Sequence, residues 1–397
     1  MISLLRSDVE LIIEMYLDDL ASCFPDNMIG LLGLEDGTRV IGTGFGAPGV
    51  VAGELVFTTI MSGYEEALTD PSYHGEMLLF TYPLQGNYGV SGDDFQSDGM
   101  WPRAMICREH WDRPTHHRLN KTLNQFLLDE GRPGLCDVDT RMLTIKVREQ
   151  GVLKAAVAVG EKDEIMDLDV VGLARSQPDI SSQDLLRDVT CKNPYRIEGR
   201  GKRIAVIDLG IKRRILRSLS DRDFDLMVLP AHSTIQDIEA AGPDALFLSN
   251  GPGDPERAEK AIHAVRHFAG EMPIFGICLG HQVISLALGG ETFKLKFGHH
   301  GGNQPVKDLE KGIVYITSQN HNFAVVPSSL EGTGLEVTQL NASDGTVEGI
   351  ESKSLDVIAV QYHPEAYPGP HCTTDHFFSS VVRVMNGKNG RALAGRG

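Results

Sequence analysis

The stretch Phe275-Gly276-Ile277-Cys278-Leu279-Gly280-His281-Gln282 decides the fold of the C-terminal half of this chain. An apolar run over residues 273–277 predicts a buried strand, and a helical pattern follows Cys278. Gly276 and Gly280 flank the cysteine at two-residue spacing, and their lack of a side chain allows the helix to approach the strand closely. The helix N-terminus favours a thiolate over a thiol at Cys278. This turn therefore indicates a cysteine nucleophile that acts in acyl transfer.

Apolar strands and helices alternate around this turn, beginning at Arg203. Strands that are apolar on both faces and alternate with helices are typical of a parallel sheet covered on both sides. Ligands of such sheets bind at the carboxyl ends of the strands, where we expect Cys278 and the loop at Asn250. The predicted strands cover residues 204–207, 226–229, 245–248, 273–277 and 356–360, and the predicted helices include residues 214–219 and 255–270.

The N-terminal part of the chain has a different pattern, with strands and glycine-rich loops from Met28 to about Gly151. A strand at residues 31–34 runs into the dipeptide Asp36-Gly37, which favours a hairpin turn. We therefore predict an α/β protein, with a C-terminal parallel-sheet domain and a smaller β-rich α+β domain before it. The expected boundaries are 28–152 for the N-terminal domain, 153–201 for a connecting segment, 202–385 for the sheet domain and 386–397 for a flexible tail.

Residues 1–27 combine a capping-box pattern with acidic residues along an amphipathic helix. Secretory signals begin with basic residues and transit peptides avoid acidic ones, so neither class fits this segment. We interpret it as an N-terminal extension that lies upstream of the true start at Met28, or else as a peripheral helix.

Composition and charge exclude several classes of protein. The net charge of −17 over 397 residues argues against a broad nucleic-acid surface. Six cysteines at scattered positions fit a reducing cytoplasm better than a disulfide framework. No apolar run approaches the roughly 20 residues that span a bilayer. We therefore expect a cytoplasmic protein that binds neither nucleic acid nor membrane.

Metal and nucleotide motifs are weak in this sequence. Cys278 and His281 are three residues apart, as in half of a zinc site, but no second Cys/His pair follows at zinc spacing. The chain also lacks the Gly-x-x-x-x-Gly-Lys-Ser/Thr loop that binds nucleotide phosphates. The sequence thus predicts no metal and no cofactor in this chain.

A cysteine that attacks an amide needs a base, a group that orients the base, and donors for the oxyanion. His363 follows a predicted strand and is the candidate base. In an extended backbone Glu365 shares a face with His363, so its carboxylate can hold one ring nitrogen. The expected oxyanion donors are the backbone N–H of Leu279 and that of Gly253, in the glycine-rich loop 250–255.

Residues 276–282, together with His363-Pro364-Glu365, resemble the catalytic motifs of a class I (triad) glutamine amidotransferase. Further motifs resemble the small subunit of carbamoyl-phosphate synthetase, and they distinguish this family from the rest of the superfamily. The resemblance spans about Met28 to Phe378. The distinguishing motifs are residues 61–73 (MSGYEEALTDPSY), 81–83 (TYP), 86–89 (GNYG), 139–144 (DTRMLT) and 296–303 (KFGHHGGN).

This resemblance implies a glutaminase subunit that releases ammonia from L-glutamine and passes it through an internal tunnel to a separate large subunit, as a heterodimer. The large subunit would use ATP, Mg²⁺ and bicarbonate to make carbamoyl phosphate for arginine and pyrimidine biosynthesis. Cys278 would be the nucleophile, His363 the general base and acid, and Glu365 its orienting partner. The implied glutamine contacts are Ser72, Gly251, Gly253, Leu279, Gln282, Asn320, Asn322 and Phe323.

The sequence departs from the family pattern at Asn322, where the family usually has glycine. Asparagine accepts a positive φ better than most residues, but glutamine affinity would fall if a close backbone approach is needed there. Two alternatives remain open, namely another enzyme with the same elbow (a different triad amidotransferase or a peptidase) and a catalytically weak scaffold for the large subunit. The N-terminal motifs argue against the first, and the intact Cys278, His363 and Glu365 argue against the second.

Overall fold

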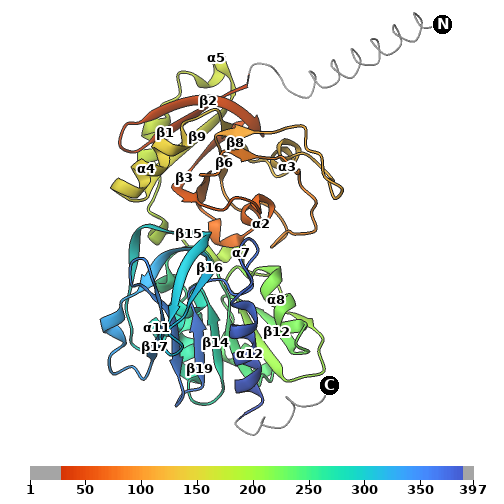
Figure 1. Ribbon diagram of the computed structural model, residues 1–397, viewed down its shortest axis with the longest axis vertical. Coiled ribbons are helices and arrows are strands. Elements are labelled where there is room, and N and C mark those ends of the chain that lie inside the picture. Colours follow the sequence, from red (N-terminus) through yellow and green to blue (C-terminus); the bar gives the residue numbers. More distant parts are fainter. Residues whose placement is uncertain (1–27, 388–397) are drawn as a thin grey trace, which may run out of the picture.

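The computed structural model describes residues 28–387, which form two units stacked along the long axis of the molecule (Figure 1). The upper unit is a closed barrel, and the lower unit is a ten-stranded sheet with its helices. The expectations for residues 1–27, and for all of the predicted tail except residues 386 and 387, lie outside the described residues. Within residues 28–387, no helix is both long and apolar enough to span a bilayer.

Seven strands close the barrel in the order β1-β2-β8-β6-β4-β3-β9. The predicted hairpin is confirmed, since β1 and β2 pair antiparallel across a turn in which Gly37 has a φ of 99°. β9 pairs with both β1 and β3 and so closes the barrel. The strands are β1 (Met28–Leu34), β2 (Arg39–Gly46), β3 (Gly49–Thr58), β4 (Glu76–Phe80), β6 (Ala104–Ile106), β8 (Pro133–Cys136) and β9 (Leu153–Glu161).

The closing strand β9 begins one residue after the expected domain end at residue 152, so the barrel extends into the segment expected to be a connection. A small parallel pair, β5 (Leu84–Gln85) and β7 (Glu109–His110), lies outside the barrel. The helices and 3-10 turns of residues 28–189 are α2 (Tyr64–Leu68), η1 (Pro71–Tyr73), α3 (Leu123–Asp129), α4 (Thr140–Gln150), α5 (Lys162–Ile165), α6 (Val170–Ser176), η2 (Ile180–Ser182) and α7 (Leu186–Val189).

The large sheet has the order β10-β12-β11-β13-β14-β19-β18-β17-β15-β16. Its five central strands, from β12 to β19, are parallel, and antiparallel strands extend it at both edges. The parallel strands are β12 (Asp225–Pro230), β11 (Arg203–Asp208), β13 (Ala245–Leu248), β14 (Ile274–Ile277) and β19 (Val357–Val360). The antiparallel strands are β10 (Tyr195–Ile197), β18 (Val347–Ser352), β17 (Glu336–Asn341), β15 (Thr292–Asp308) and β16 (Val314–Val325).

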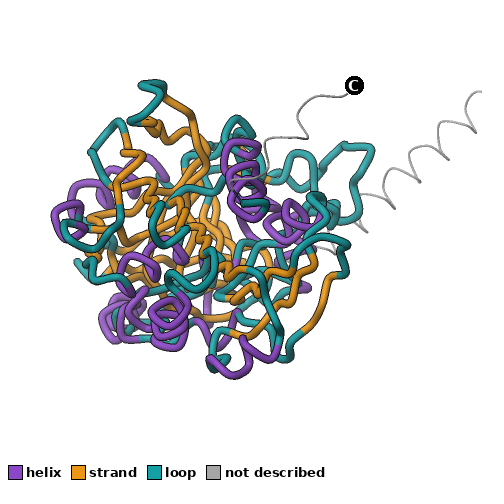
Figure 2. Tube along the Cα trace, turned by 90° about the horizontal axis from the view of Figure 1, so that it is seen from below, coloured by secondary structure: helices purple, strands orange, loops and turns teal. Residues whose placement is uncertain are grey.

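Alternate residues of β11 face opposite layers of helices, as the two-residue period of a strand requires. Ala205 and Ile207 pack in one core with helices α9, α10 and α11, whereas Ile204 and Val206 pack in a second core with α8 and α12. Figure 2 shows helices around the central strands. The predicted α/β fold is therefore confirmed. The helices are α8 (Arg213–Ser220), α9 (Ile235–Ala240), α10 (Glu259–Phe268), α11 (Leu279–Ala287) and α12 (Thr374–Met385), with 3-10 turns η3 (Pro255–Arg257) and η4 (Pro327–Leu330).

The helix predicted over residues 255–270 is interrupted near its start. Its first turn is the 3-10 segment η3, where the Asp254 side chain accepts a hydrogen bond from Glu256 N. Ala258 then has non-helical angles, with φ −82° and ψ 43°, so α10 begins only at Glu259. Gly270 has a φ of 83° just beyond the end of α10, where the sequence predicted a stop.

Candidate active site

Cys278 lies in a strained turn between β14 and α11. Its φ of 54° and ψ of −105° are unfavourable for a residue with a side chain and are typical of nucleophile elbows. Its N–H donates to Val360 O (2.9 Å), which ties the turn to β19. A Cβ at Gly280 would lie 2.2 Å from Leu248 O, and one at Gly276 would lie 2.8 Å from the Gly280 carbonyl carbon. These two glycines therefore allow the close approach of helix and strand that the sequence predicted.

His363 and Glu365 make the contact that their spacing predicts. His363 Nδ1 lies 2.6 Å from Glu365 Oε1, and both side chains are buried. The His363 N–H donates to Ser318 O (2.8 Å), so strand β16 holds the backbone in place. The second ring nitrogen, Nε2, is buried and has no hydrogen-bond partner among residues 28–387. Because Glu365 occupies Nδ1, Nε2 is the nitrogen left for the nearby Cys278.

Lys212 completes this buried group, although none of the sequence motifs pointed to it. Its Nζ donates to Glu365 Oε1 (3.0 Å) and to Ala366 O (2.7 Å), and its side chain is only 1% exposed. Its backbone N–H donates to Asn250 Oδ1 (3.1 Å). Lys212 follows the carboxyl end of β11, the same edge of the sheet as Cys278. The rule that placed the Asn250 loop at this edge could have identified Lys212 as well.

Burial and charge pairing shift the pKa values of His363 and Glu365 in opposite directions. Burial disfavours the charged form of His363, but the Glu365 carboxylate and the Cys278 side chain favour it, and the pKa of His363 is raised to about 10. Burial also disfavours the Glu365 carboxylate, yet the Lys212 ammonium and the imidazolium lower the pKa of Glu365 to about 2. At neutral pH the group therefore places a positive imidazolium beside the Cys278 sulfur.

A narrow cavity beside Cys278 brings together most of the residues expected to contact glutamine. Ser72 reaches it from η1 of the barrel unit, so the cavity lies between the two units. Asn250 Nδ2 donates to Ser72 Oγ (3.0 Å) across this boundary. Leu279 does not line the cavity, and His321 lines it without having been predicted. The expected residues that line it are Ser72, Gly251, Gly253, Cys278, Gln282, Asn320, Asn322 and Phe323.

The two N–H groups expected to bind an oxyanion have no other acceptor. Leu279 is the first residue of α11, and the first N–H groups of a helix lack intrahelical partners. Gly253, with a φ of 82°, lies in the loop that follows β13. Neither N–H donates to another atom of residues 28–387. Both are therefore available to an oxygen that develops negative charge.

Hydrogen bonds fix the side chain of Gln282, which also lines the cavity. Gln282 Nε2 donates to Phe323 O (2.7 Å) and to Gln361 Oε1 (3.0 Å). This leaves the Gln282 carbonyl oxygen as an acceptor for a ligand. Cys278 Sγ lies 3.5 Å from Asn320 O, so β16 also contacts the nucleophile directly.

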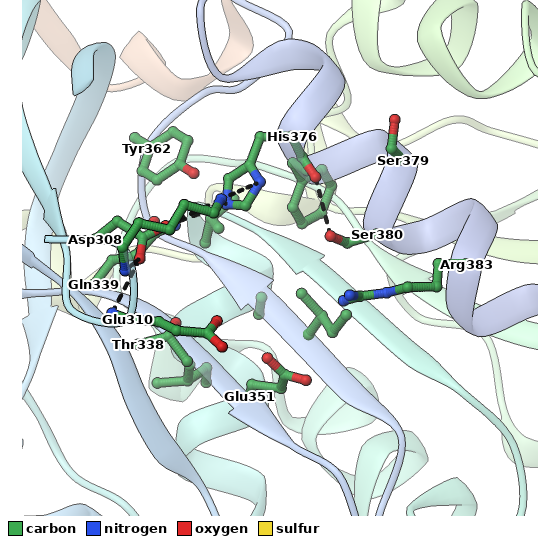
Figure 3. A pocket seen from close by; sticks show the side chains of 16 residues that line it. Asp308, Glu310, Thr338, Gln339, Glu351, Tyr362, His376, Ser379, Ser380 and Arg383 are labelled. Carbon is green, nitrogen blue, oxygen red and sulfur yellow. Dashed lines mark hydrogen bonds and ion pairs between the residues drawn. The ribbon is translucent and has the colours of Figure 1, made fainter. Parts of the chain in front are cut away.

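A second cavity lies on the surface between α12 and strands β17–β19 (Figure 3). Its wall carries charges of both signs, including Asp308, Glu351 and Arg383. Tyr362, the residue before His363, lines this cavity, but neither Cys278 nor His363 does. It is therefore separate from the cysteine site.

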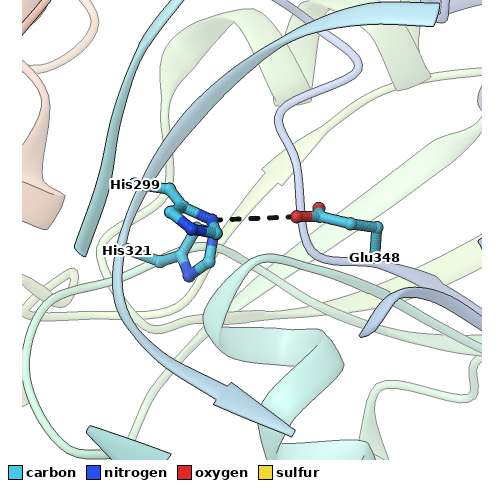
Figure 4. A group of neighbouring side chains, drawn as sticks. All are labelled: His299, His321 and Glu348. Carbon is cyan, nitrogen blue, oxygen red and sulfur yellow. Dashed lines mark ion pairs between the residues drawn. The ribbon is translucent and has the colours of Figure 1, made fainter. Parts of the chain in front are cut away.

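Within the described part of the chain, the side chains of His299, His321 and Glu348 place possible metal-ligand atoms close together (Figure 4). Gln319 Oε1, however, lies 3.1 Å from His299 Nδ1 and 3.1 Å from His321 Nε2. The other two ring nitrogens also have hydrogen-bond partners, which are Asp344 and a backbone carbonyl. Because every imidazole nitrogen already has a protein partner, we assign no metal to this group.

A cysteine elbow at the carboxyl edge of a parallel sheet, next to a buried His–Glu pair, defines a class I glutamine amidotransferase, and the family model "Glutamine amidotransferase class-I" matches residues 205–383. The model "Carbamoyl-phosphate synthase small chain, CPSase domain" matches residues 32–157. The chain belongs to the family of carbamoyl-phosphate synthase small chains, enzymes of class EC 6.3.5.5.

Two relatives of similar length, both from Methanosarcina, support this assignment. The chain is 53% identical over 369 residues to the carbamoyl phosphate synthase small chain of Methanosarcina acetivorans, covering 91% of this chain and 100% of the relative. It is 52% identical over 369 residues to the same protein of Methanosarcina mazei, with the same coverage. Among solved structures, a putative GMP synthase component of Thermoplasma acidophilum matches with a TM-score of 0.41 and 23% identity, covering 47% of this chain and 95% of that chain.

Proposed function

We propose that this chain hydrolyses the side-chain amide of L-glutamine and supplies the ammonia to a large synthase chain. One observation carries the proposal, namely that Cys278 lies at a strained elbow beside a buried imidazolium held by Glu365 and Lys212. This arrangement suits a thiolate nucleophile whose neighbouring ring can deliver a proton to a leaving amine.

The reaction follows from these positions. The Cys278 thiolate attacks the amide carbon of glutamine, and the N–H groups of Leu279 and Gly253 bind the resulting oxyanion. His363 gives its proton to the nitrogen as the C–N bond breaks, so that ammonia leaves and a thioester remains. His363 then accepts a proton from water, the water oxygen attacks the thioester, and glutamate and the Cys278 thiolate are released.

The other residues that line the cavity bind the α-ammonium and α-carboxylate of glutamine in this proposal. An α-ammonium and an α-carboxylate need fixed polar partners, and the free carbonyl oxygen of Gln282 is suited to the ammonium. Ser72 offers a hydroxyl from the barrel side, and Gly251 lets the backbone approach the ligand. We assign Asn320, Asn322 and Phe323 to the wall formed by β16.

The names of the relatives support a division of labour. They are called small chains of carbamoyl phosphate synthase, which implies a larger partner chain. We propose that the large chain uses ATP, Mg²⁺ and bicarbonate, receives ammonia through an internal tunnel, and makes carbamoyl phosphate for arginine and pyrimidine biosynthesis in the cytoplasm. No cofactor is assigned to the small chain in this scheme.

Ammonia release from glutamine tests the proposal. The full chain should release ammonia slowly alone and faster with the large chain, and Cys278→Ser should abolish the reaction in both cases. The complex should make carbamoyl phosphate with either glutamine or free ammonia. Synthesis from free ammonia alone would instead favour a non-catalytic scaffold, and cleavage of peptide bonds would favour a peptidase.

A further inference from the structure

The hydrogen bonds of the Gln282 side-chain amide fix which of its two ends faces the protein. Its nitrogen donates to Phe323 O (2.7 Å) and to Gln361 Oε1 (3.0 Å). A backbone carbonyl can only accept a hydrogen bond, so the end of the amide that contacts Phe323 must be the nitrogen. Both hydrogens of Gln282 Nε2 are therefore bonded inside the protein.

The carbonyl oxygen of the same amide is left for a ligand. Among residues 28–387 no N–H or O–H group donates to Gln282 Oε1. The oxygen is nevertheless not closed off from solvent, although the residue as a whole is only 2% exposed. Since Gln282 lines the cavity beside Cys278, this oxygen faces the cavity, where it can accept from an ammonium group.

Gln361 supplies the second acceptor without lining the cavity itself. It follows β19, its side chain is fully buried, and the cavity is lined by other residues. Its backbone N–H donates to Glu348 O (2.9 Å), which extends the pairing of β19 with β18 and fixes the position of the acceptor. Within the described part of the chain, only Gln282 donates to Gln361 Oε1. Gln361 can thus act on a ligand only through Gln282.

The second acceptor restricts the Gln282 amide in a way that one acceptor does not. A single bond to Phe323 O would let the plane of the amide turn about that bond. Without Gln361 Oε1, one N–H of Gln282 would also be buried without a partner, which is unfavourable. The amide would then turn this N–H toward the water of the cavity. Either movement displaces the carbonyl oxygen, and an N–H in its place opposes the binding of an ammonium.

We propose that Gln361 is a positioning residue that makes the cavity selective for substrates with an α-ammonium, because it holds the Gln282 carbonyl oxygen toward the cavity. This inference rests on the proposed hydrolysis of glutamine and adds a determinant of specificity to it. The reacting amide of glutamine is attacked by Cys278, at the opposite end of the substrate from its ammonium. Loss of the acceptor at Gln361 should therefore weaken binding and leave bond breaking in bound glutamine nearly unchanged.

A purely structural role of Gln361 predicts a different result. Gln361 stands two residues before His363, so a general loosening of this segment would misplace the base and lower kcat. It would also weaken ligands with and without an ammonium to the same extent. Selectivity and the division between KM and kcat therefore distinguish the two roles.

Glutaminase kinetics of the full chain, assembled with its large chain, give the first test. Gln361→Met keeps the length of the side chain but removes the acceptor, so KM for L-glutamine should rise about tenfold and kcat should stay within about twofold. Gln361→Glu keeps an acceptor oxygen in either protonation state. It also breaks no hydrogen bond, since Gln361 Nε2 has no partner among residues 28–387, and its KM should stay within about threefold.

Gln339→Met is the matched control for these kinetics. Gln339 is also a buried glutamine, but it belongs to β17 and does not line the cavity beside Cys278. Its KM for glutamine should be unchanged. Partial unfolding of a variant lowers kcat and not KM, so the comparison holds even if a variant is less stable.

Binding to the full chain with Cys278→Ser measures selectivity without hydrolysis. Calorimetry compares L-glutamine with glutaramate, which is the same molecule without its α-amino group. Glutamine should bind at least about 10-fold more tightly than glutaramate, because the ammonium makes a charge-assisted hydrogen bond. Adding Gln361→Met should weaken glutamine about tenfold and leave the Kd of glutaramate within about twofold.

Four results would overturn the proposal. They are an unchanged affinity for glutamine in Gln361→Met, an equal loss of affinity for both ligands, a failure of Gln361→Glu to restore KM, and a raised KM in the Gln339→Met control. Absence of ammonia release from glutamine by the unmodified enzyme would overturn the proposed function instead.

Discussion

The two walls of the cavity beside Cys278 are built in different ways. On one wall lies Cys278 of the sheet unit, and next to it are His363 and Glu365 of the same unit, whose charges pair at 2.6 Å. On the other wall hydrogen bonds connect the two units, from Asn250 Nδ2 to Ser72 Oγ and from Asn322 Nδ2 to Glu76 Oε1. The first wall is suited to chemistry, and the second is suited to recognition. We therefore expect variants of the first to lower kcat and variants of the second to raise KM.

Two buried histidines, one near each wall, differ in the direction in which their pKa is shifted. His363 and His300 are both nearly inaccessible to solvent, so burial disfavours a charge on either ring. Glu365 touches His363 directly, and the pKa of that ring is raised. Asn320 and Asn322 stand between His300 and the carboxyl groups of Asp70 and Glu76, and burial lowers the pKa of His300 to about 4. Direct contact with a carboxylate, rather than depth of burial, decides which ring can act as an acid at neutral pH.

The largest effect is expected for Cys278→Ser. A serine at the elbow keeps the shape of the site but does not ionise near neutral pH, so kcat for glutamine hydrolysis should fall at least about 1,000-fold. Glutamine binding measured by calorimetry should remain near that of the unmodified chain. A variant that keeps more than a tenth of the activity would show that the first wall does not hold the nucleophile.

A smaller effect is expected when the buried charges beside His363 are removed. Glu365→Ala misorients the ring, which should lower kcat about 100-fold. It also leaves Lys212 buried without its carboxylate, so the free energy of unfolding should fall by about 3–5 kcal/mol. Denaturant unfolding and initial rates measure the two quantities separately.

The double variant Lys212→Met/Glu365→Gln is the matched control for this pair. Removing both charges avoids an unpaired buried ion, so most of the stability should return while kcat stays low. Should the double variant be as unstable as Glu365→Ala, packing rather than charge pairing would explain the loss.

The pH dependence of kcat tests whether His363 carries a proton in the active enzyme. Because the pKa of His363 is raised to about 10, the imidazolium is present below that pH and is lost as the pH rises through it. The ring must carry this proton when ammonia leaves, so kcat should hold from about pH 7 to 9 and fall beyond. In Glu365→Ala the fall should begin at lower pH. A profile that rises up to pH 10 would instead indicate a neutral ring in the active form.

The sequence predicted the first wall well, because its geometry is local. The elbow requires only glycine at positions 276 and 280. His363 and Glu365 are two residues apart, and a turn closed by the bond from Ala366 N–H to His363 O (3.1 Å), rather than the extended backbone expected, brings their side chains together. These relations hold wherever the segment lies in the fold. The positions of the five parallel strands were likewise predicted from their apolar runs, whereas the antiparallel strands at the sheet edges were not.

The second wall and Lys212 could not be predicted in the same way. The bond between Asn322 and Glu76 depends on how the barrel docks against β16, and no local pattern encodes that docking. Residues 153–161, which form the closing strand β9, were expected to belong to a connecting segment. The pairing of β9 with β1 depends on the tertiary structure, and the sequence of the strand alone does not indicate it. The position of Lys212 after the carboxyl end of β11 was a signal for a site residue. Its carboxylate partner, Glu365, comes from a distant segment, so the ion pair itself could not be predicted.

The smallest effect is expected for Ser72→Ala on the second wall. The change removes the hydroxyl that accepts from Asn250 Nδ2 and that faces the cavity, while Cys278 and His363 keep their partners. Loss of one hydrogen bond should raise KM for glutamine about three- to tenfold and change kcat little. Ser285→Ala is the control, because Ser285 is also buried and donates to His281 O but does not line the cavity. If Ser72→Ala lowered kcat with KM unchanged, the barrel would take part in the chemistry and the division between the walls would not hold.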